Sequence, residues 1–267
     1  MIKPEDFTDI TYEVEEPDAV AVVTINRPER YNSFRGRTVD ELIAALKHAW
    51  ADRRVASIIL TGAGDKAFCA GGDVKERAET GSYGETEWGT FEIQRLHQVM
   101  RDIPKPVIAA VNGVAVGGGH VLHVLCDLSV ASETARFGQS GPRVGSFDAG
   151  FGSAYLARVV GEKRARQIWF LLDLYDAQTA ERWGLVNDVV APEALLDKAH
   201  EYARKIASYS PTALRFLKHS FNADTDHRQG LGNVAFAGLD LFVESEEAKE
   251  GAAAFAEKRD PDFGPYR

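Results

Sequence analysis

The sequence predicts an α/β fold in which strands alternate with helices before a final helical region. Three observations lead to this prediction. Short apolar runs end at glycine-rich turns, helical spacing follows these turns, and the pattern becomes mainly helical after Tyr155. The chain has 267 residues, of which 45% are hydrophobic, so it can bury a large core.

The first half of the chain alternates strand and helix signals. The apolar run at residues 20–25 is stopped by Asn26-Arg27-Pro28, and helical spacing follows at residues 38–50, where Thr38 and Glu41 have the spacing of a capping box. A polar stretch without a clean period, residues 76–90, is expected to form a loop. Further strands are expected at residues 57–61, 106–111 and 128–130, and further helices at residues 91–100 and 120–126.

The second half is mainly helical. A short strand is expected within residues 184–190, and no internal repeat or flexible linker divides the chain. Helices that come late in a chain often pack between subunits, which favours an oligomer. The expected helices cover residues 165–172, 177–183, 195–207, 211–222 and 233–242.

The composition excludes several classes of function. A net charge of -9 argues against a nucleic-acid partner. No apolar run has the length of a membrane span, and the acidic start at residues 1–6 lacks the apolar stretch of a signal peptide. The two cysteines, Cys69 and Cys126, fit neither a disulfide framework nor a zinc pattern, so we expect a protein of the reducing cytoplasm.

Two glycine-rich turns are the main chemical signal. Residues 117–119 are three glycines between a strand and a helix, without the spacing of a dinucleotide-binding or Walker motif. Glycines let the backbone approach a ligand closely, and free N–H groups at a helix start suit a developing oxyanion. Residues 70–73, Ala-Gly-Gly-Asp, follow another strand in the same way. The pair indicates an oxyanion site, although tight turns with close helix packing would need the same glycines.

Five motifs together resemble those of the crotonase (enoyl-CoA hydratase/isomerase) superfamily. The resemblance implies a ClpP-like spiral of ββα turns with an acyl-CoA site at residues 1–200, and a helical trimerisation region at residues 201–267. It implies a homotrimer or a hexamer of two trimers, and it places the oxyanion donors at the N–H groups of Gly72 and Gly118. The motifs are Asn26-Arg27-Pro28, Ala67-Phe68-Cys69-Ala70-Gly71-Gly72-Asp73, Pro104-Lys105-Pro106-Val107-Ile108-Ala109, Gly117-Gly118-Gly119 and Phe137-Gly138-Gln139.

A narrower resemblance concerns the reaction. Hydratases of the superfamily use two glutamates, and the corresponding positions here hold Val121 and Gly141, which cannot transfer a proton. Residues 138–152 instead resemble the 1,4-dihydroxy-2-naphthoyl-CoA synthases, and residues 119–123 and 166–170 fit the same branch. In those enzymes the enolate of an acyl-CoA attacks a carboxyl group of the same molecule and closes a ring.

This resemblance also implies roles for three side chains. Ser146 and Asp148 would bind and protonate the second carbonyl, although Asp148 could equally be a turn or cap residue in a glycine-rich loop. Tyr83 would lie over the substrate and help handle the α proton, the alternative being a solvated loop aromatic.

The resemblance further implies a base that is not a side chain. Some synthases have an aspartate at the position of Gly141, and others have glycine and bind bicarbonate. Here Gln139, Ser140 and Trp169 would line the bicarbonate pocket around Gly141, and a packed loop with Trp169 in the core is the alternative. We expect no tightly bound cofactor, with coenzyme A serving as the substrate carrier.

Coenzyme A contacts are also implied by the resemblance. They would involve Phe68, Ala70 and Asp73, together with a C-terminal segment from a neighbouring subunit that contains Phe255 and Lys258. A lysine suits a phosphate group, whereas a solvated helix end is the alternative. Four histidines are scattered in the sequence without the spacing of metal ligands, so no metal site is expected at His120, His123, His219 or His227.

The leading hypothesis is an enzyme that makes or breaks a C–C bond through a thioester enolate, most like the synthases. At position 243 this chain has valine, whereas the synthases have a tyrosine that reaches the site of a neighbouring subunit. Residues 34–36, 40–43 and 220–225 resemble 2-ketocyclohexanecarboxyl-CoA hydrolase, which opens a ring with water and normally has the same tyrosine. Two alternatives stay open: an enoyl-CoA hydratase/isomerase of other specificity, and a non-catalytic CoA- or RNA-binding protein of this fold.

Overall fold

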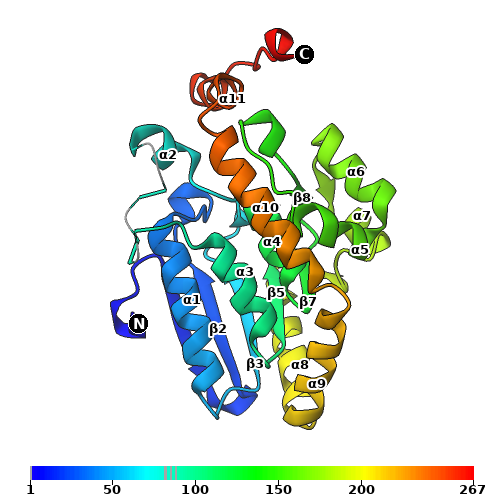
Figure 1. The fold of residues 1–267 in the computed structure, drawn as a ribbon. Coiled ribbons are helices and arrows are strands. Elements are labelled where there is room, and N and C mark those ends of the chain that lie inside the picture. The colour runs from blue at the N-terminus through cyan, green and yellow to red at the C-terminus, as the bar shows by residue number, and fades with distance from the viewer. Residues whose placement is uncertain (1, 81–82, 85, 88) are drawn as a thin grey trace.

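Two β-sheets form the centre of the protein. The computed structural model describes residues 2–80, 83–84, 86–87 and 89–267 (Figure 1). The larger sheet has the order β1 (Ile10–Glu15), β2 (Val20–Ile25), β3 (Ser57–Gly62), β5 (Val107–Val111), β7 (Leu128–Ser132) and β10 (Asp188–Val190). The smaller sheet has the order β4 (Ala67–Cys69), β6 (Val114–Val116), β8 (Arg136–Gly138) and β9 (Tyr175–Asp176).

Successive strand pairs divide between the two sheets. In the pairs β3–β4, β5–β6 and β7–β8, the first strand joins the larger sheet and the second joins the smaller one. Neighbouring strands within each sheet run parallel, except that β1 and β2, and β8 and β9, run antiparallel. After β6 the chain enters helix α4 (Gly118–Leu125). This arrangement is the predicted spiral of ββα turns.

Helices cover both faces of the larger sheet. Helices α1 (Gly36–Ala51) and α3 (Ile93–Asp102) pack against each other on one face, and α8 (Leu195–Ala207) contacts β3, β5 and β7 on the other (Figure 1). Every residue of β3 is therefore buried, as expected for a parallel strand with both faces covered.

The remaining helices lie mostly in the second half of the chain. The predicted boundary after residue 200 falls inside α8, whose Ala199 and Ala203 pack in the same apolar cluster. The division into two regions thus stays a prediction. These helices are α2 (Val74–Thr80), α5 (Leu156–Val160), α6 (Glu162–Leu171), α7 (Ala177–Arg182), α9 (Pro211–Ala223), α10 (His227–Phe242) and α11 (Glu246–Glu257). Short 3-10 turns occur at Pro4–Asp6, Glu16–Asp18, Pro28–Arg30, Gly141–Arg143, Pro192–Ala194 and Gly264–Tyr266, and a π-helical turn occurs at Phe151–Tyr155.

Most predicted elements are present, with two corrections. Thr38 is not the N-cap of α1: Arg35 holds that position, and the Thr38 hydroxyl accepts its backbone N–H at 3.1 Å. Glu41 turns instead to the β1 side and accepts the N–H groups of Thr8 and Asp9. The expected polar loop is helical up to Thr80, because α2 begins directly after the glycine turn, and residues 81, 82, 85 and 88 of it lie outside the described residues. No helix of the described chain combines the length and apolarity needed to cross a bilayer.

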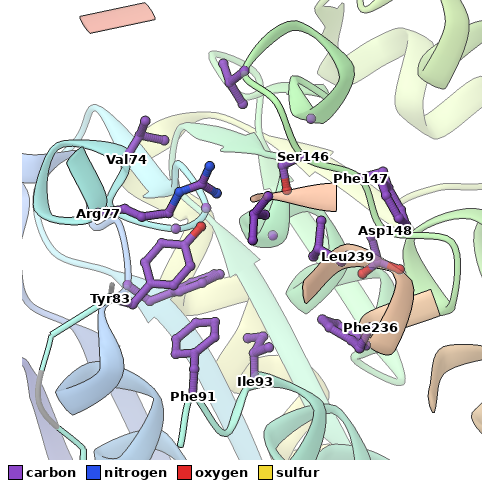
Figure 2. A pocket seen from close by; sticks show the side chains of 18 of the residues that line it. Val74, Arg77, Tyr83, Phe91, Ile93, Ser146, Phe147, Asp148, Phe236 and Leu239 are labelled. Carbon is purple, nitrogen blue, oxygen red and sulfur yellow. The ribbon is translucent and has the colours of Figure 1, made fainter. Parts of the chain in front are cut away.

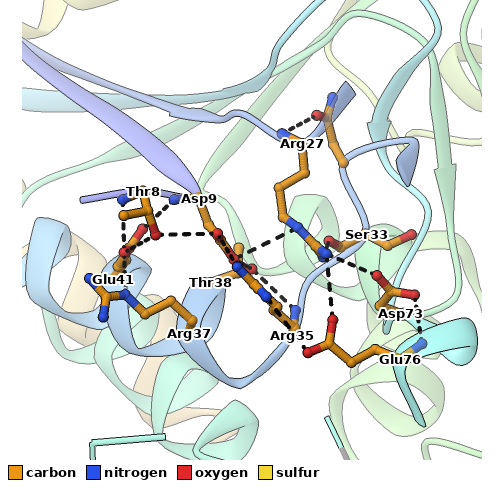
Figure 3. Close-up of polar contacts among 11 residues, drawn as sticks. Thr8, Asp9, Arg27, Ser33, Arg35, Arg37, Thr38, Glu41, Asp73 and Glu76 are labelled. Carbon is orange, nitrogen blue, oxygen red and sulfur yellow. Dashed lines mark hydrogen bonds and ion pairs between the residues drawn. The ribbon is translucent and has the colours of Figure 1, made fainter. Parts of the chain in front are cut away.

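A buried ion network anchors the first glycine turn (Figure 3). The Arg27 guanidinium is 7% exposed and lies 3.0 Å from a carboxylate oxygen of Asp73, the residue that ends the turn. Arg35 pairs with Asp9 at 2.8 Å, and Thr38 donates to Asp9 at 2.6 Å. Burial raises the pKa of Asp9, but the hydrogen bonds and charges of its partners outweigh this effect and hold the pKa below its usual value. The network joins β1, α1 and the start of α2 beneath the turn.

The two glycine turns touch each other. Gly119 lies so close to the first turn that an added Cβ would be 1.9 Å from the carbonyl oxygen of Cys69. A Cβ on Gly71, whose φ is +87°, would lie 3.0 Å from the backbone nitrogen of Gly118. Both obstacles are backbone atoms, which cannot turn aside as a side chain can. Glycine is therefore required for the two turns to approach each other.

We expect Gly119→Ala to destabilise the protein by at least about 2 kcal/mol, because overpacking here must displace backbone. The matched control is Gly230→Ala, also within a helix, where an added Cβ would meet nothing within 4 Å. That variant should be neutral or more stable by up to about 1 kcal/mol, from helix propensity alone. Urea unfolding of both variants measures the difference, and equal stabilities would contradict the close approach.

Candidate active site

One cavity of about 520 Å³ lies where the two glycine turns meet α3, α10 and residues 139–148. Figure 2 shows Arg77, Tyr83, Phe91 and Ile93 on one side of it and Asp148 on the other. Of the predicted site residues, the cavity wall includes Ala70, Gly72, Tyr83, Gly118, Gln139, Ser140, Gly141, Ser146, Asp148 and Trp169. The fold thus brings together residues that are nearly 100 positions apart in the sequence.

Two backbone N–H groups are available at one end of the cavity. Gly118 is the first residue of α4, and its N-cap Gly117 has φ +58°, so the Gly118 N–H lies outside the helical hydrogen-bond ladder. Gly72 and Phe34 form a parallel β-bridge, in which the Gly71 carbonyl accepts the Phe34 N–H and the Phe34 carbonyl accepts the Asp73 N–H. The bridge therefore does not use the Gly72 N–H. Neither the Gly72 nor the Gly118 N–H donates to another described residue. Two free donors beside a helix start suit a carbonyl oxygen that gains negative charge.

Tyr83 lies directly over the first glycine turn. A Cβ on Gly72 would be 2.8 Å from the Tyr83 hydroxyl oxygen, and the Tyr83 ring stacks on Phe91 with centroids 4.4 Å apart. The Tyr83 carbonyl accepts the Gly36 N–H at 2.6 Å, which ties this segment to the start of α1. The hydroxyl is thereby placed beside the predicted oxyanion site.

Asp148 is held at the far end of the cavity by backbone donors. One carboxylate oxygen accepts the N–H groups of Gly150 at 2.9 Å and of Gly152 at 3.0 Å. The other oxygen has no hydrogen bond to a described residue, so it is available to a ligand. Asp148 and Val121 both border Gly152, since a Cβ on Gly152 would meet each of them within 3.0 Å. Asp148 can therefore hold the loop through one oxygen, as a cap residue does, and contact a ligand through the other.

Ser146 and Gly141 pack against each other. The Ser146 N–H donates to the Gly141 carbonyl at 2.9 Å, and a Cβ on Gly141 would lie 2.8 Å from the Ser146 carbonyl oxygen. A side chain at position 141 would therefore have to move the loop that carries Ser146. In this chain glycine at 141 is a packing requirement as well as the absence of an acid.

The residues predicted to hold bicarbonate lie in the cavity wall, but two already have partners. The Gln139 amide is 2% exposed and donates to Nδ1 of His120 at 3.3 Å. Burial lowers the pKa of His120 to about 3, so its ring stays neutral and can accept this bond. The Trp169 indole N–H donates to the Gly152 carbonyl at 2.5 Å. Gln139 keeps a second N–H and its carbonyl oxygen for a ligand.

The residues predicted to bind coenzyme A separate into four places. Ala70 lines the cavity, Phe68 is fully buried in the core, and the Asp73 carboxylate is occupied by Arg27. Phe255 and Lys258, at the end of α11, line a second cavity of about 530 Å³. Both cavities have Ser140 and Val144 in their walls, so Phe255 and Lys258 are close to the first cavity within one chain.

Several cavity residues were missed in the sequence. Arg77, on α2, lies four residues after the predicted residue Asp73, so helical spacing could have placed it near the site. His97, on α3, has no predicted site residue at helical spacing. Helix α10 adds Phe236, Leu239 and Asp240 to the wall. Val243, which directly follows α10, lines the same cavity, whereas the tyrosine of the synthases at this position was expected to reach a neighbouring subunit's site.

Histidines elsewhere are structural in character. His120 and His123 are fully buried with ring centroids 5.0 Å apart, and burial lowers the pKa of both. Away from the cavity, three ligand-type side chains lie within 4.8 Å of one another at the β1–α8 contact: Glu15, Asp18 and His200.

The comparisons with known proteins agree with this architecture. Residues 15–265 match the family model described as enoyl-CoA hydratase/isomerase. A carnitinyl-CoA hydratase from Mycobacterium avium is 32% identical, with a TM-score of 0.84 over 96% of this chain and 98% of that one. An enoyl-CoA hydratase from Mycobacterium avium subsp. paratuberculosis is 29% identical, with a TM-score of 0.83 over 96% and 98%.

A third structure is an enoyl-CoA hydratase from Bacillus anthracis, 34% identical, with a TM-score of 0.73 over 96% of this chain and 98% of that one. The family match extends over almost the whole chain, and the predicted superfamily is thereby confirmed. The chain belongs to the enoyl-CoA hydratase/isomerase family and is an acyl-CoA enzyme of the crotonase superfamily.

Proposed function

We propose that this enzyme makes or breaks a C–C bond through a thioester enolate, most like the 1,4-dihydroxy-2-naphthoyl-CoA synthases. The observation that carries the proposal is Asp148, which has one carboxylate oxygen fixed by two N–H groups and the other free at the far end of the cavity. Its carboxyl group lies across the cavity from Tyr83 (Figure 2). This spacing suits a substrate with two reacting carbonyl groups.

The makeup of the cavity supports this reaction over hydration. Among the described residues of its wall, the only carboxylates are Asp148 and Asp240, and no glutamate is present. The position of one hydratase glutamate is Val121, which is 1% exposed and, like Asp148, borders Gly152. Adding water across a double bond needs a base that takes a proton from the water at the β carbon and an acid that gives a proton to the α carbon.

The ring closure would proceed in two steps. A base removes a proton from the carbon next to the thioester, and the negative charge moves onto the thioester oxygen beside the Gly72 and Gly118 N–H groups. The enolate carbon then forms a bond to the carboxyl carbon of the same acyl group, and that carboxyl loses a hydroxyl as water. Asp148, once protonated at its free oxygen, and Ser146 would donate the proton and the hydrogen bond that this departure requires.

We further propose bicarbonate as the base. The wall near Gly141 offers the second Gln139 N–H, and the Ser140 hydroxyl, to an anion of this size. A partly enclosed site of this kind would hold the anion close to the α carbon without a side-chain carboxylate.

We also propose that the chain forms a trimer or a hexamer. Large apolar side chains of α9 and α10 are exposed in the single chain, which is typical of surfaces that meet another subunit. They include Phe216 at 70%, Phe221 at 77%, Val234 at 72% and Leu241 at 79%.

The substrate test separates three candidate reactions. We expect turnover of o-succinylbenzoyl-CoA with loss of water, followed by the absorbance of the naphthoyl product. Turnover of 2-ketocyclohexanecarboxyl-CoA instead would favour the ring-opening alternative. Rapid hydration of crotonyl-CoA, the type of activity that the names of the solved relatives suggest, would overturn the proposal.

Asp148→Asn should lower kcat by about a hundredfold or more, because the amide retains an acceptor for Gly150 and Gly152 but has no proton to give. Binding of coenzyme A thioesters should change little. The control is Asp240→Asn, because Asp240 is an exposed carboxylate of the same wall, on α10. This variant should lower kcat by less than about tenfold. Equal effects of the two variants would remove the assigned role of Asp148.

A further inference from the structure

His97 is the buried polar side chain of the cavity that the proposed reaction leaves without a role. It is 1% exposed, lies in the second turn of α3 and forms part of the cavity wall. Neither ring nitrogen has a hydrogen-bond partner among the described residues. A buried imidazole without partners costs about 1–3 kcal/mol for each unsatisfied group, so such an arrangement is uncommon unless a ligand completes it.

Two aromatic rings pack near the His97 imidazole. Its ring meets Phe151 edge-on at 5.9 Å and Phe236 at 6.3 Å, and neither offers a hydrogen-bonding atom. Phe151 lies between Gly150 and Gly152, whose N–H groups hold Asp148, so His97 and Asp148 share one end of the cavity. The guanidinium of Arg101, one turn further along α3, lies over the Phe151 ring, 5.3 Å from its centroid.

The imidazole is neutral near neutral pH. Burial lowers the pKa of His97, and the nearby Asp148 carboxylate opposes this effect without cancelling it. A neutral ring has one donor and one acceptor nitrogen, so it can bind a carbonyl or carboxyl oxygen without placing a second charge beside Asp148.

We propose that His97 is a specificity-determining residue, which hydrogen-bonds an oxygen of the acyl group remote from the thioester. This inference rests on the proposed function and narrows it to acyl groups that have a ketone or carboxyl group at their far end. An acyl chain with only hydrogen and carbon at its far end would leave the imidazole without a hydrogen-bond partner in the complex. The site would therefore reject plain acyl chains, because buried polar groups without partners disfavour the apolar analogue.

Binding to three thioesters tests this without turnover. The probes are 4-phenylbutanoyl-CoA, 4-oxo-4-phenylbutanoyl-CoA and 4-(2-carboxyphenyl)butanoyl-CoA, whose remote ends have no oxygen, a ketone and a carboxyl group, respectively. Wild-type protein should bind at least one oxygen-bearing probe more tightly than the plain one in calorimetry. His97→Leu should reduce that preference by about tenfold to a hundredfold, mainly by weakening the oxygen-bearing probe. Gln98→Leu removes a polar side chain from the same helix outside the cavity wall and should leave the preference unchanged.

Two further variants identify the nitrogen and cover the case in which His97→Leu does not fold. His97→Asn retains a polar group near the position of Nδ1, and His97→Gln retains one near Nε2, so one of them should keep the preference and the other should lose it. Equal binding of all probes by the wild type, or an equal loss for all probes in the variants, would overturn the proposal. If the preference depends on His97 but o-succinylbenzoyl-CoA is not turned over, the proposed reaction fails and this inference stands.

Discussion

The close contact between two glycine turns is the constraint on which the site depends. Gly71 and Gly119 allow the backbone after β4 to touch the backbone at the start of α4, where a single added carbon would meet carbonyl or amide atoms. The contact fixes the Gly72 and Gly118 N–H groups at one end of the cavity, and the buried Arg27–Asp73 pair holds the first turn from below. In the proposed reaction these N–H groups would stabilise charge from a backbone that needs no reorganisation.

The opposite end of the cavity depends on side chains placed by a short loop. Backbone N–H groups fix one oxygen of Asp148, and Gly141 packs against the carbonyl of Ser146, so the loop sets both positions together. Such a division is consistent with one fold serving several reactions. In the proposed reaction the backbone would stabilise the enolate, and the loop side chains would decide what happens to it. His97 adds a neutral polar group to this second end.

The longer strands and helices could be predicted from the sequence, because their hydrophobic patterns extend over many residues and stop at clear turn or helix-ending residues. The strand at residues 20–25 and the helix at residues 195–207 have the expected bounds. The strands β6 and β8 have three residues each and were missed, since so short a run has no readable period. Thr38 was misplaced because Arg35, an unusual N-cap residue, begins the helix earlier. His97 was missed because a lone histidine on an apolar helix face resembles an ordinary core residue, and only its unpaired nitrogens distinguish it.

The most direct test of the account is exchange of the α protons of 4-oxo-4-phenylbutanoyl-CoA in D₂O, followed by NMR. This thioester can form the enolate, but it lacks the carboxyl group needed for ring closure. We expect deuterium at the α carbon at a rate well above the enzyme-free rate, with bicarbonate required. Asp148→Asn should retain this exchange, since that residue acts at the other carbonyl. Exchange no faster than without enzyme would contradict enolate stabilisation by the Gly72 and Gly118 N–H groups.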